Sequence, residues 1–287
     1  MDRPAGFFDV PLLRYVGSKW MIADWITQFF PEHDCYVEPF MGSGAMFFRK
    51  APSAIEVLND LNSDLVNFYQ VLRTQGPDLI QAIELTPFSR REYMLAYEMV
   101  DDNPLEQARR FYVRCWMSFG ASEGRRTGFR YQRNVNRGTC VTREWSRTEG
   151  LQFAAKELKT AIIESLPALE IIKRYDTPRT LFYLDPPYVK KSRSGGVGRN
   201  RYLHEMTDSD HREMAAALQQ IQGTAIVSGY ASELYDELFA GWKTYSKSTT
   251  TNGQGRAMEY VWLHPRIATL PSAYRQPETR FMFEDLA

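Results

Sequence analysis

The chain has 287 residues, of which 44% are hydrophobic and 24% are charged, and its formal net charge is zero. Length and composition are typical of a globular protein with a substantial core, built as one large domain or two smaller ones. The balanced charge excludes a uniformly basic nucleic-acid-binding protein. Any affinity for nucleic acid must therefore come from local clusters of basic residues.

The sequence also lacks several signals that would point to other classes of protein. The polar start Met1–Pro4 is followed by no apolar segment, and no run of about 18 apolar residues occurs, so neither secretion nor a membrane span is expected. Cys35, Cys115 and Cys140 have no metal-ligand spacing and are typical of a reduced cytoplasmic protein. None follows a proline, which excludes the Pro-Cys nucleophile used on cytosine C5.

The first predicted helix follows the segment Pro11–Trp20. Ser18 is a candidate N-cap, the apolar residues of Ile22–Phe29 have helical spacing, and Pro31 ends the pattern. Lys19 follows a Gly-Ser turn, and taken alone this position is better explained by a solvated lysine in the first turn of a helix.

A strand, a glycine turn and a helix are predicted next. Cys35–Glu38 forms the strand, Pro39–Gly44 the turn, and the helix opens at Ala45. This arrangement lets a nucleotide-like ligand approach the backbone closely. The turn has neither the dinucleotide fingerprint nor a phosphate-binding Lys-Ser/Thr, and a purely structural turn is about equally consistent with it.

A second strand, Ile55–Leu58, is followed by Asp60. An acid at this offset from the glycine turn is suited to binding ribose hydroxyls. The alternative role is capping of the helix whose apolar face begins at Leu65. Asn62 or Ser63 would cap that helix equally well, which would leave Asp60 free for a ligand.

The middle of the chain changes from amphipathic helices to a basic, glycine-rich segment, Gly120–Arg147. Arginine makes bidentate contacts to phosphate or guanine, and asparagine or glutamine can read adenine. Their mixture with aromatic residues favours nucleic-acid binding over a solvated basic face. The residues predicted to contact nucleic acid here are Arg125, Arg126, Arg130, Arg133, Asn134 and Arg137.

The stretch Leu181–Tyr188 is the strongest candidate for chemistry. Its first four residues predict a buried strand, and Asp185 follows at the carboxyl end, where open α/β sheets place ligands. Pro186 and Pro187 remove two backbone donors and stiffen the corner, which presents a carboxylate, carbonyl oxygens and the Tyr188 ring. Taken alone, the segment is better explained as a strand that ends in a surface turn.

Further elements flank this stretch. A basic loop, 190–201, contains Lys190, Lys191 and Arg199 and is suited to a polyanion. The other predicted elements are helices over Phe153–Leu166, Asp208–Ile221 and Ser232–Phe239, a strand over Ala225–Ser228, and an antiparallel edge pair over Trp242–Ser246 and Tyr260–His264.

Four segments together resemble the DNA adenine methylase (Dam) family of S-adenosylmethionine-dependent N6-adenine methyltransferases. In the family's order they are Tyr15–Lys19, Val37–Gly44, Asn59–Leu65 and Asp185–Tyr188. The resemblance implies an α/β fold, a Rossmann-like methyltransferase sheet with helices on both faces, plus a mainly helical inserted target-recognition domain. It places the catalytic domain at 1–75 and 148–287 and the DNA-binding target-recognition domain at 76–147.

The resemblance also assigns roles to residues. Asp185 and the Pro186 carbonyl would accept the two N6 hydrogens of a flipped-out adenine, with Pro187 rigid beside them and Tyr188 stacked on the base. The residues implied to bind the methyl donor are Tyr15, Lys19, Glu38, Phe40, Gly42, Gly44, Asp60 and Asp185. The family often has Trp at the position of Tyr15. The segment Gly120–Arg147 departs from the pattern of enzymes that read GATC, which leaves the target sequence open.

Partners and alternatives follow from the same resemblance. It implies double-stranded DNA as partner, no metal and no membrane, a cognate restriction endonuclease as a candidate partner, and a cytoplasmic, nucleoid-associated protein of bacterial or phage origin. The oligomeric state is left open. The alternatives are N4-cytosine methylation at the same corner, a protein or small-molecule methyltransferase, and an inactive DNA-binding relative. Asp rather than Ser at 185 favours adenine.

Overall fold

The computed structural model describes residues 11–98, 102–120, 126–132, 140–189, 202–250 and 256–267. Its main element is a seven-stranded sheet with the strand order β5-β2-β1-β6-β7-β9-β8. The strands are β1 (Cys35–Glu38), β2 (Ile55–Asn59), β5 (Ala161–Glu164), β6 (Thr180–Leu184), β7 (Thr224–Gly229), β8 (Lys243–Thr250) and β9 (Arg256–Leu263).

Most neighbouring strands are parallel, and β9 alone in this sheet runs against both of its neighbours, β7 and β8. The antiparallel pairing of the two late strands is therefore confirmed. Residues of β1 and β6 alternate between two buried clusters: Tyr36 and Tyr183 pack on one face, and Val37 and Phe182 on the other. Both faces of the sheet are thus covered, as expected for parallel strands that are apolar throughout.

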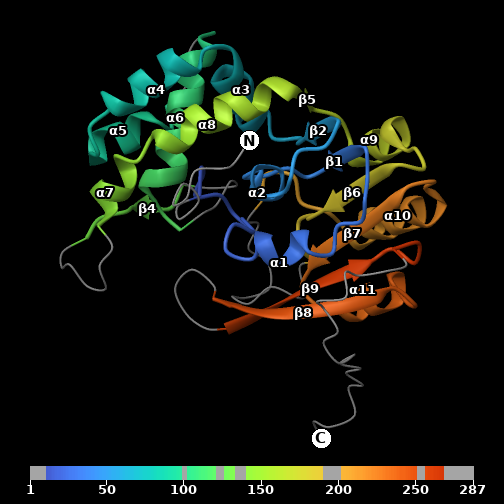
Figure 1. Cartoon of the computed structure of the whole chain (residues 1–287). Coiled ribbons are helices and arrows are strands. Elements are labelled where there is room, and N and C mark those ends of the chain that lie inside the picture. Colours follow the sequence, from blue (N-terminus) through green and yellow to red (C-terminus); the bar gives the residue numbers. More distant parts are fainter. Residues whose placement is uncertain are drawn as a thin grey trace, which may run out of the picture.

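Helices supply the two covering layers (Figure 1). Helices α1, α2 and α3 pack on the Tyr36 face, and α9, α10 and α11 pack on the Val37 face. The predicted Rossmann-like fold is therefore confirmed. The helices are α1 (Ala23–Thr27), α2 (Ala45–Arg49), α3 (Ser63–Thr74), α4 (Gly76–Glu84), α5 (Arg90–Leu95), α6 (Pro104–Met117), α7 (Val141–Trp145), α8 (Glu149–Glu157), α9 (Ala168–Tyr175), α10 (Asp208–Gln220) and α11 (Glu233–Leu238).

Helices α4 to α7 gather at one side of the sheet, at the upper left of Figure 1, together with the short pair β3 (Ser118–Phe119) and β4 (Gly128–Phe129). They share one core with the sheet. The Phe68 ring of α3 stacks on Tyr112 of α6 at 5.9 Å, and the Trp116 indole donates to the Leu12 carbonyl at 3.1 Å. The predicted division into domains at 76 and 148 stays a prediction.

One predicted helix is wrong in its second half. The segment 153–166 was expected to be helical throughout, but α8 ends at Glu157, and Leu158–Thr160 forms a single 3-10 turn. Ala161–Glu164 then becomes β5, the strand that pairs with β2 at one edge of the sheet. Pairing with β2 and the two β-branched isoleucines outweigh the helical tendency of the residues before them.

The predicted N-cap is also wrong. Helix α1 begins at Ala23, and its N-cap residue Ile22 makes no side-chain cap bond. Ser18 lies earlier and its hydroxyl is 2.8 Å from that of Ser43, so it joins the first segment to the glycine turn.

In the described part of the chain, no helix combines the length and the apolar character that spanning a membrane would require.

Candidate active site

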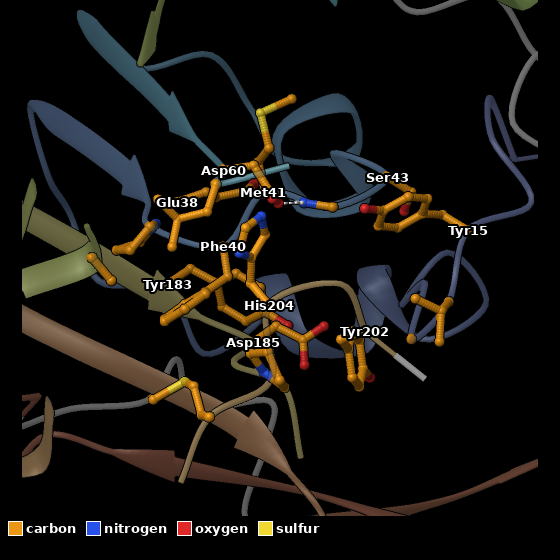
Figure 2. Close-up of a pocket in the computed structure, with 18 of the residues that line it drawn as sticks. Tyr15, Glu38, Phe40, Met41, Ser43, Asp60, Tyr183, Asp185, Tyr202 and His204 are labelled. Carbon is orange, nitrogen blue, oxygen red and sulfur yellow. Dashed lines mark hydrogen bonds between the residues drawn. The ribbon is translucent and has the colours of Figure 1, made fainter. Parts of the chain in front are cut away.

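A cavity of about 550 Å³ lies at the carboxyl ends of β1, β2 and β6. This is the edge of an open α/β sheet at which ligands bind. Figure 2 shows Asp60 and Asp185 on different sides of the space, with His204 between them in that view. The predicted donor-binding residues that line the cavity are Tyr15, Lys19, Glu38, Phe40, Gly42, Asp60 and Asp185. Only Gly44 of that set does not line it.

The glycine turn owes its shape to two residues with positive φ. Gly42 has φ +46° and Gly44 has φ +64°, a region that strongly favours glycine. A Cβ on Gly44 would also lie 2.7 Å from the Phe48 ring. The amide of Asn59, buried at the end of β2, bonds the Pro39 carbonyl at 2.9 Å and fixes the start of the turn. Sequence reasoning missed Asn59, whose signal was a polar residue that ends a buried strand.

Asp60 is held by the turn rather than by a helix. Its carboxylate accepts hydrogen bonds from the backbone N–H groups of Gly42 at 3.0 Å and Asn62 at 2.9 Å. The side chain of Asn62 caps α3 by accepting from the N–H of Asp64 at 3.1 Å. The capping role therefore falls to Asn62. Burial raises the pKa of Asp60, opposed by these backbone bonds.

Glu38 ends β1 with its side chain almost fully buried. It accepts a 2.7 Å hydrogen bond from the Tyr36 hydroxyl and another from the backbone N–H of Phe47, both neutral donors. Burial raises the pKa of Glu38 to about 8. Because Glu38 lines the cavity, a cationic group that enters would stabilise the ionised carboxylate.

Tyr15 connects the cavity to helix α6. Its hydroxyl accepts a hydrogen bond from the side-chain amide of Asn62 at 3.1 Å, and its ring lies 6.2 Å from that of Phe111 in α6. The ring also lies beside Gly42, where an added Cβ would meet it at 3.5 Å.

Asp185 is held by a buried lysine. Lys19 is 5% exposed, and its ammonium donates to both oxygens of Asp185 at 2.7 Å. The Ser228 hydroxyl adds a 3.2 Å bond to Oδ1. Burial raises the pKa of Asp185, and the positive charge of Lys19 opposes this rise. The interpretation of Lys19 as a solvated lysine is therefore wrong.

The remaining acceptor capacity of Asp185 follows from this geometry. A carboxylate offers about four lone-pair sites. Among the described residues, Lys19 uses one on each oxygen and Ser228 uses a second on Oδ1, which leaves capacity on Oδ2. Asp185 lines the cavity, so it is oriented to accept one hydrogen from a ligand.

Tyr188 points its hydroxyl into the protein. It accepts a hydrogen bond from Lys19 and donates to Glu259 at 3.1 Å, while its ring lies 4.5 Å from that of Tyr230. Asp185 and Pro187 line the cavity, whereas Pro186 and Tyr188 are not among the lining residues. Stacking of Tyr188 on a base stays a prediction. Sequence reasoning missed Glu259, a single acid inside the mainly apolar strand β9.

A second lining segment was also missed. Tyr202, His204 and Met206 follow the basic loop and also line the cavity, and Figure 2 shows Tyr202 and His204 beside the same space. The positive charge of His204 lowers the pKa of Asp60, which places the imidazole within electrostatic reach of that carboxylate.

The predicted DNA-contacting residues are described only in part. Arg126 is exposed and lies 6.0 Å from the Tyr97 ring. Arg130 is 15% exposed and donates to Glu144 at 2.6 Å, so a neighbouring acid partly neutralises it. Seven of the predicted residues lie outside the described ranges: Arg125, Arg133, Asn134, Arg137, Lys190, Lys191 and Arg199.

Within the described ranges, no group of three or more His, Cys, Asp or Glu residues is arranged to hold a metal ion.

Comparison with known proteins decides the family. The model of the D12 class N6 adenine-specific DNA methyltransferases matches residues 15–252. The chain belongs to this family. The match includes all four segments that carry the resemblance, which is thereby confirmed. The chain is an adenine-specific DNA methyltransferase by family, and the N4-cytosine alternative is not favoured.

Individual relatives agree with the family. The type II methyltransferase M1.LlaDCHI of Lactococcus lactis subsp. cremoris is 27% identical over 260 residues, which cover 85% of this chain and 89% of that protein. The DNA adenine methylase of Salmonella typhi is 27% identical over 63% of this chain and 65% of its own length. The DNA N-6-adenine-methyltransferase of Escherichia phage P1 is 36% identical over 78 residues, 27% of this chain and 10% of that protein. The chain thus spans most of the first relative and less than two thirds of the other two.

Proposed function

We propose that the protein transfers a methyl group from S-adenosylmethionine to N6 of an adenine that is flipped out of double-stranded DNA. The observation that carries the proposal is the environment of Asp185. Its carboxylate is fixed by Lys19 and Ser228, yet it faces a cavity that Glu38 and Asp60 also line.

The residues around the cavity fit the donor. S-adenosylmethionine would supply an electrophilic sulfonium methyl group. Asp60 would accept the ribose hydroxyls, a role open to it because Asn62 caps α3. Glu38 would bind a positive group of the methionine part, since its partners in the protein are neutral. The cavity volume of about 550 Å³ lies in the usual range for ligands of this size.

Asp185 and the proline corner would prepare the base. The adenine N6 is a weak nucleophile because its lone pair is delocalised into the ring. Asp185 would accept one N6 hydrogen on Oδ2, and the Pro186 carbonyl would accept the other. Both bonds would draw the nitrogen towards tetrahedral geometry and direct its lone pair at the methyl group. As the N–C bond formed, the S–C bond would break, S-adenosylhomocysteine would leave, and one N6 proton would pass to water. Since Lys19 and the two prolines hold these acceptors in place before the base arrives, little reorganisation is needed.

The DNA would be held outside this corner. Flipping a base out of the duplex costs a few kcal/mol in lost pairing and stacking. We assign the compensating phosphate and base contacts to the target-recognition segment 76–147 and to the basic loop 190–201. In the first segment, Arg126 is a described residue with an exposed side chain. The Lactococcus relative is named a type II methyltransferase, which supports a cognate restriction endonuclease and a bacterial or phage origin for this chain as well. A location in the cytoplasm at the nucleoid would follow from DNA as substrate.

A labelled-methyl transfer assay on duplex DNA, with mass spectrometry of the nucleosides, tests the proposal. The wild type is expected to form N6-methyladenine. Asp185→Asn keeps the shape but weakens the acceptor, so transfer should fall by about 10²–10³-fold, with donor and DNA affinities changed far less. Asp24→Asn, on the 68% exposed Asp24, is the matched control and should stay fully active. Production of N4-methylcytosine, or full activity of Asp185→Asn, would refute the assignment.

A further inference from the structure

A second buried carboxylate lies behind the site. Glu259 belongs to β9, is 3% exposed, and is not among the residues that line the cavity. Its Oε1 lies 3.6 Å from the Lys19 ammonium, and its two oxygens accept from the Tyr188 hydroxyl at 3.1 and 3.3 Å. Glu259 thus contacts Lys19, which holds Asp185, and Tyr188, which ends the same corner.

The Lys19 ammonium therefore interacts with two carboxylates, those of Asp185 and Glu259. In a poorly solvated interior, a single positive charge stabilises two negative charges less well than one. When Glu259 is protonated, the charge of Lys19 acts on Asp185 alone and weakens it as an acceptor. When Glu259 is ionised, Lys19 is shared and Asp185 becomes the stronger acceptor.

We propose that Glu259 is a positioning residue for methyl transfer, which acts through Lys19 and Tyr188 to hold the Asp185 corner and to set how strongly Asp185 accepts the N6 hydrogen. The inference rests on the proposed role of Asp185. Glu259 itself touches neither the base nor the donor, because another layer of side chains separates it from the cavity.

The charge of Glu259 changes near neutral pH. Burial raises the pKa of Glu259 to about 7, with the negative charge of Asp185 adding to the rise and Lys19 opposing it. As the pH rises through this value, Glu259 ionises, so the transfer rate should increase. Among the described residues, the titratable groups that interact with Glu259 are Lys19 before α1, Tyr183 in β6, and Asp185 and Tyr188 after β6. Tyr230 after β7 contacts Tyr188, and Lys247 is the register partner of Glu259 on β8.

The test is the single-turnover rate of methyl transfer between about pH 5.5 and pH 9, with donor and DNA saturating. The wild-type rate should rise about tenfold or more through a transition near neutral pH. Glu259→Gln should be about tenfold slower at high pH and should lose the transition, with donor affinity within about threefold of wild type. Glu259→Asp keeps a carboxylate and should restore a transition at a shifted midpoint.

Glu56→Gln is the matched control. Glu56 forms a buried ion pair with Lys50 at 2.6 Å, and neither residue lines the cavity, so its loss should lower stability and leave the pH transition in place. The inference is overturned if Glu259→Gln keeps the wild-type transition. It is equally overturned if Glu259→Gln does not fold and Glu259→Asp keeps the wild-type midpoint. If either of these results is found while Asp185→Asn is inactive, only the role of Glu259 is refuted and the proposed function stands. If Asp185→Asn is active, the proposed function itself is refuted.

Discussion

Replacement of Glu38 by glutamine should change how the stability of the free protein depends on pH. The pKa of Glu38 rises from 4.5 to about 8 because the folded protein buries the carboxyl group between neutral donors. Below pH 4.5 the Glu38 carboxyl is protonated in both the folded and the unfolded protein. Between the two values the unfolded chain releases the proton while the folded chain keeps it, so stability falls as the pH rises.

The size of the effect follows from the shift. Each pKa unit corresponds to about 1.4 kcal/mol, so the rise from 4.5 to about 8 corresponds to roughly 5 kcal/mol, lost by the time the pH exceeds the folded value. Glu38→Gln cannot ionise and should escape this loss. The variant should therefore gain several kcal/mol relative to wild type between about pH 5 and pH 8.5, on top of an offset independent of pH.

Urea unfolding of both proteins at several pH values, without donor, measures this difference. Other buried acids titrate in the same range, but they are common to both proteins and cancel in the comparison. Titration with S-adenosylmethionine gives a second readout, since wild-type affinity should increase with pH and that of Glu38→Gln should not. A stability difference that is the same at low and high pH would show that Glu38 is ionised throughout, and would refute the reasoning.

Two other substitutions test the turn and the basic segment. Gly44→Ala forces a Cβ to within 2.7 Å of the Phe48 ring at φ +64°, and should lower the free energy of unfolding by about 2 kcal/mol or more; an unchanged urea midpoint would contradict this. Arg130→Gln should lower stability by about 1–3 kcal/mol because Glu144 loses its closest partner. Arg126→Gln should leave stability unchanged and lower the slope of log DNA affinity against log salt concentration by about one unit. Equal stability of the Arg130 and Arg126 variants would contradict the expected difference between them.

The central strands and the carboxylates at their ends could be predicted because their signals are local. Cys35–Glu38 was predicted with the bounds that β1 has, and Asp60 and Asp185 each follow a short apolar strand directly. Parallel strands bring such ends to the same edge of a sheet, so their meeting around one cavity was a consequence of the fold. The roles of Lys19 and Glu38 came instead from the resemblance to a family.

Contacts between distant residues could not be predicted in this way. Lys19 and Asp185 are 166 positions apart, and no local pattern relates either of them to Glu259. Ser228 appears in the sequence only as a small polar residue in a strand. The edge strand β5 was missed for a related reason, because the pairing with β2 that adds to the strand preference of its two isoleucines is not visible in the local sequence.

With target recognition in the segment 76–147, as proposed, the core that α3 shares with α6 would limit how this enzyme can acquire a new target. Phe68 of α3 packs on Tyr112 of α6, Trp116 of α6 lies in the same cluster, and Tyr15 joins it beside the cavity. The segment 76–147 is therefore not expected to be exchangeable as a unit, since its removal would expose apolar side chains packed beside the cavity. New specificity is expected to arise by substitution at positions outside this core, on an unchanged helical support.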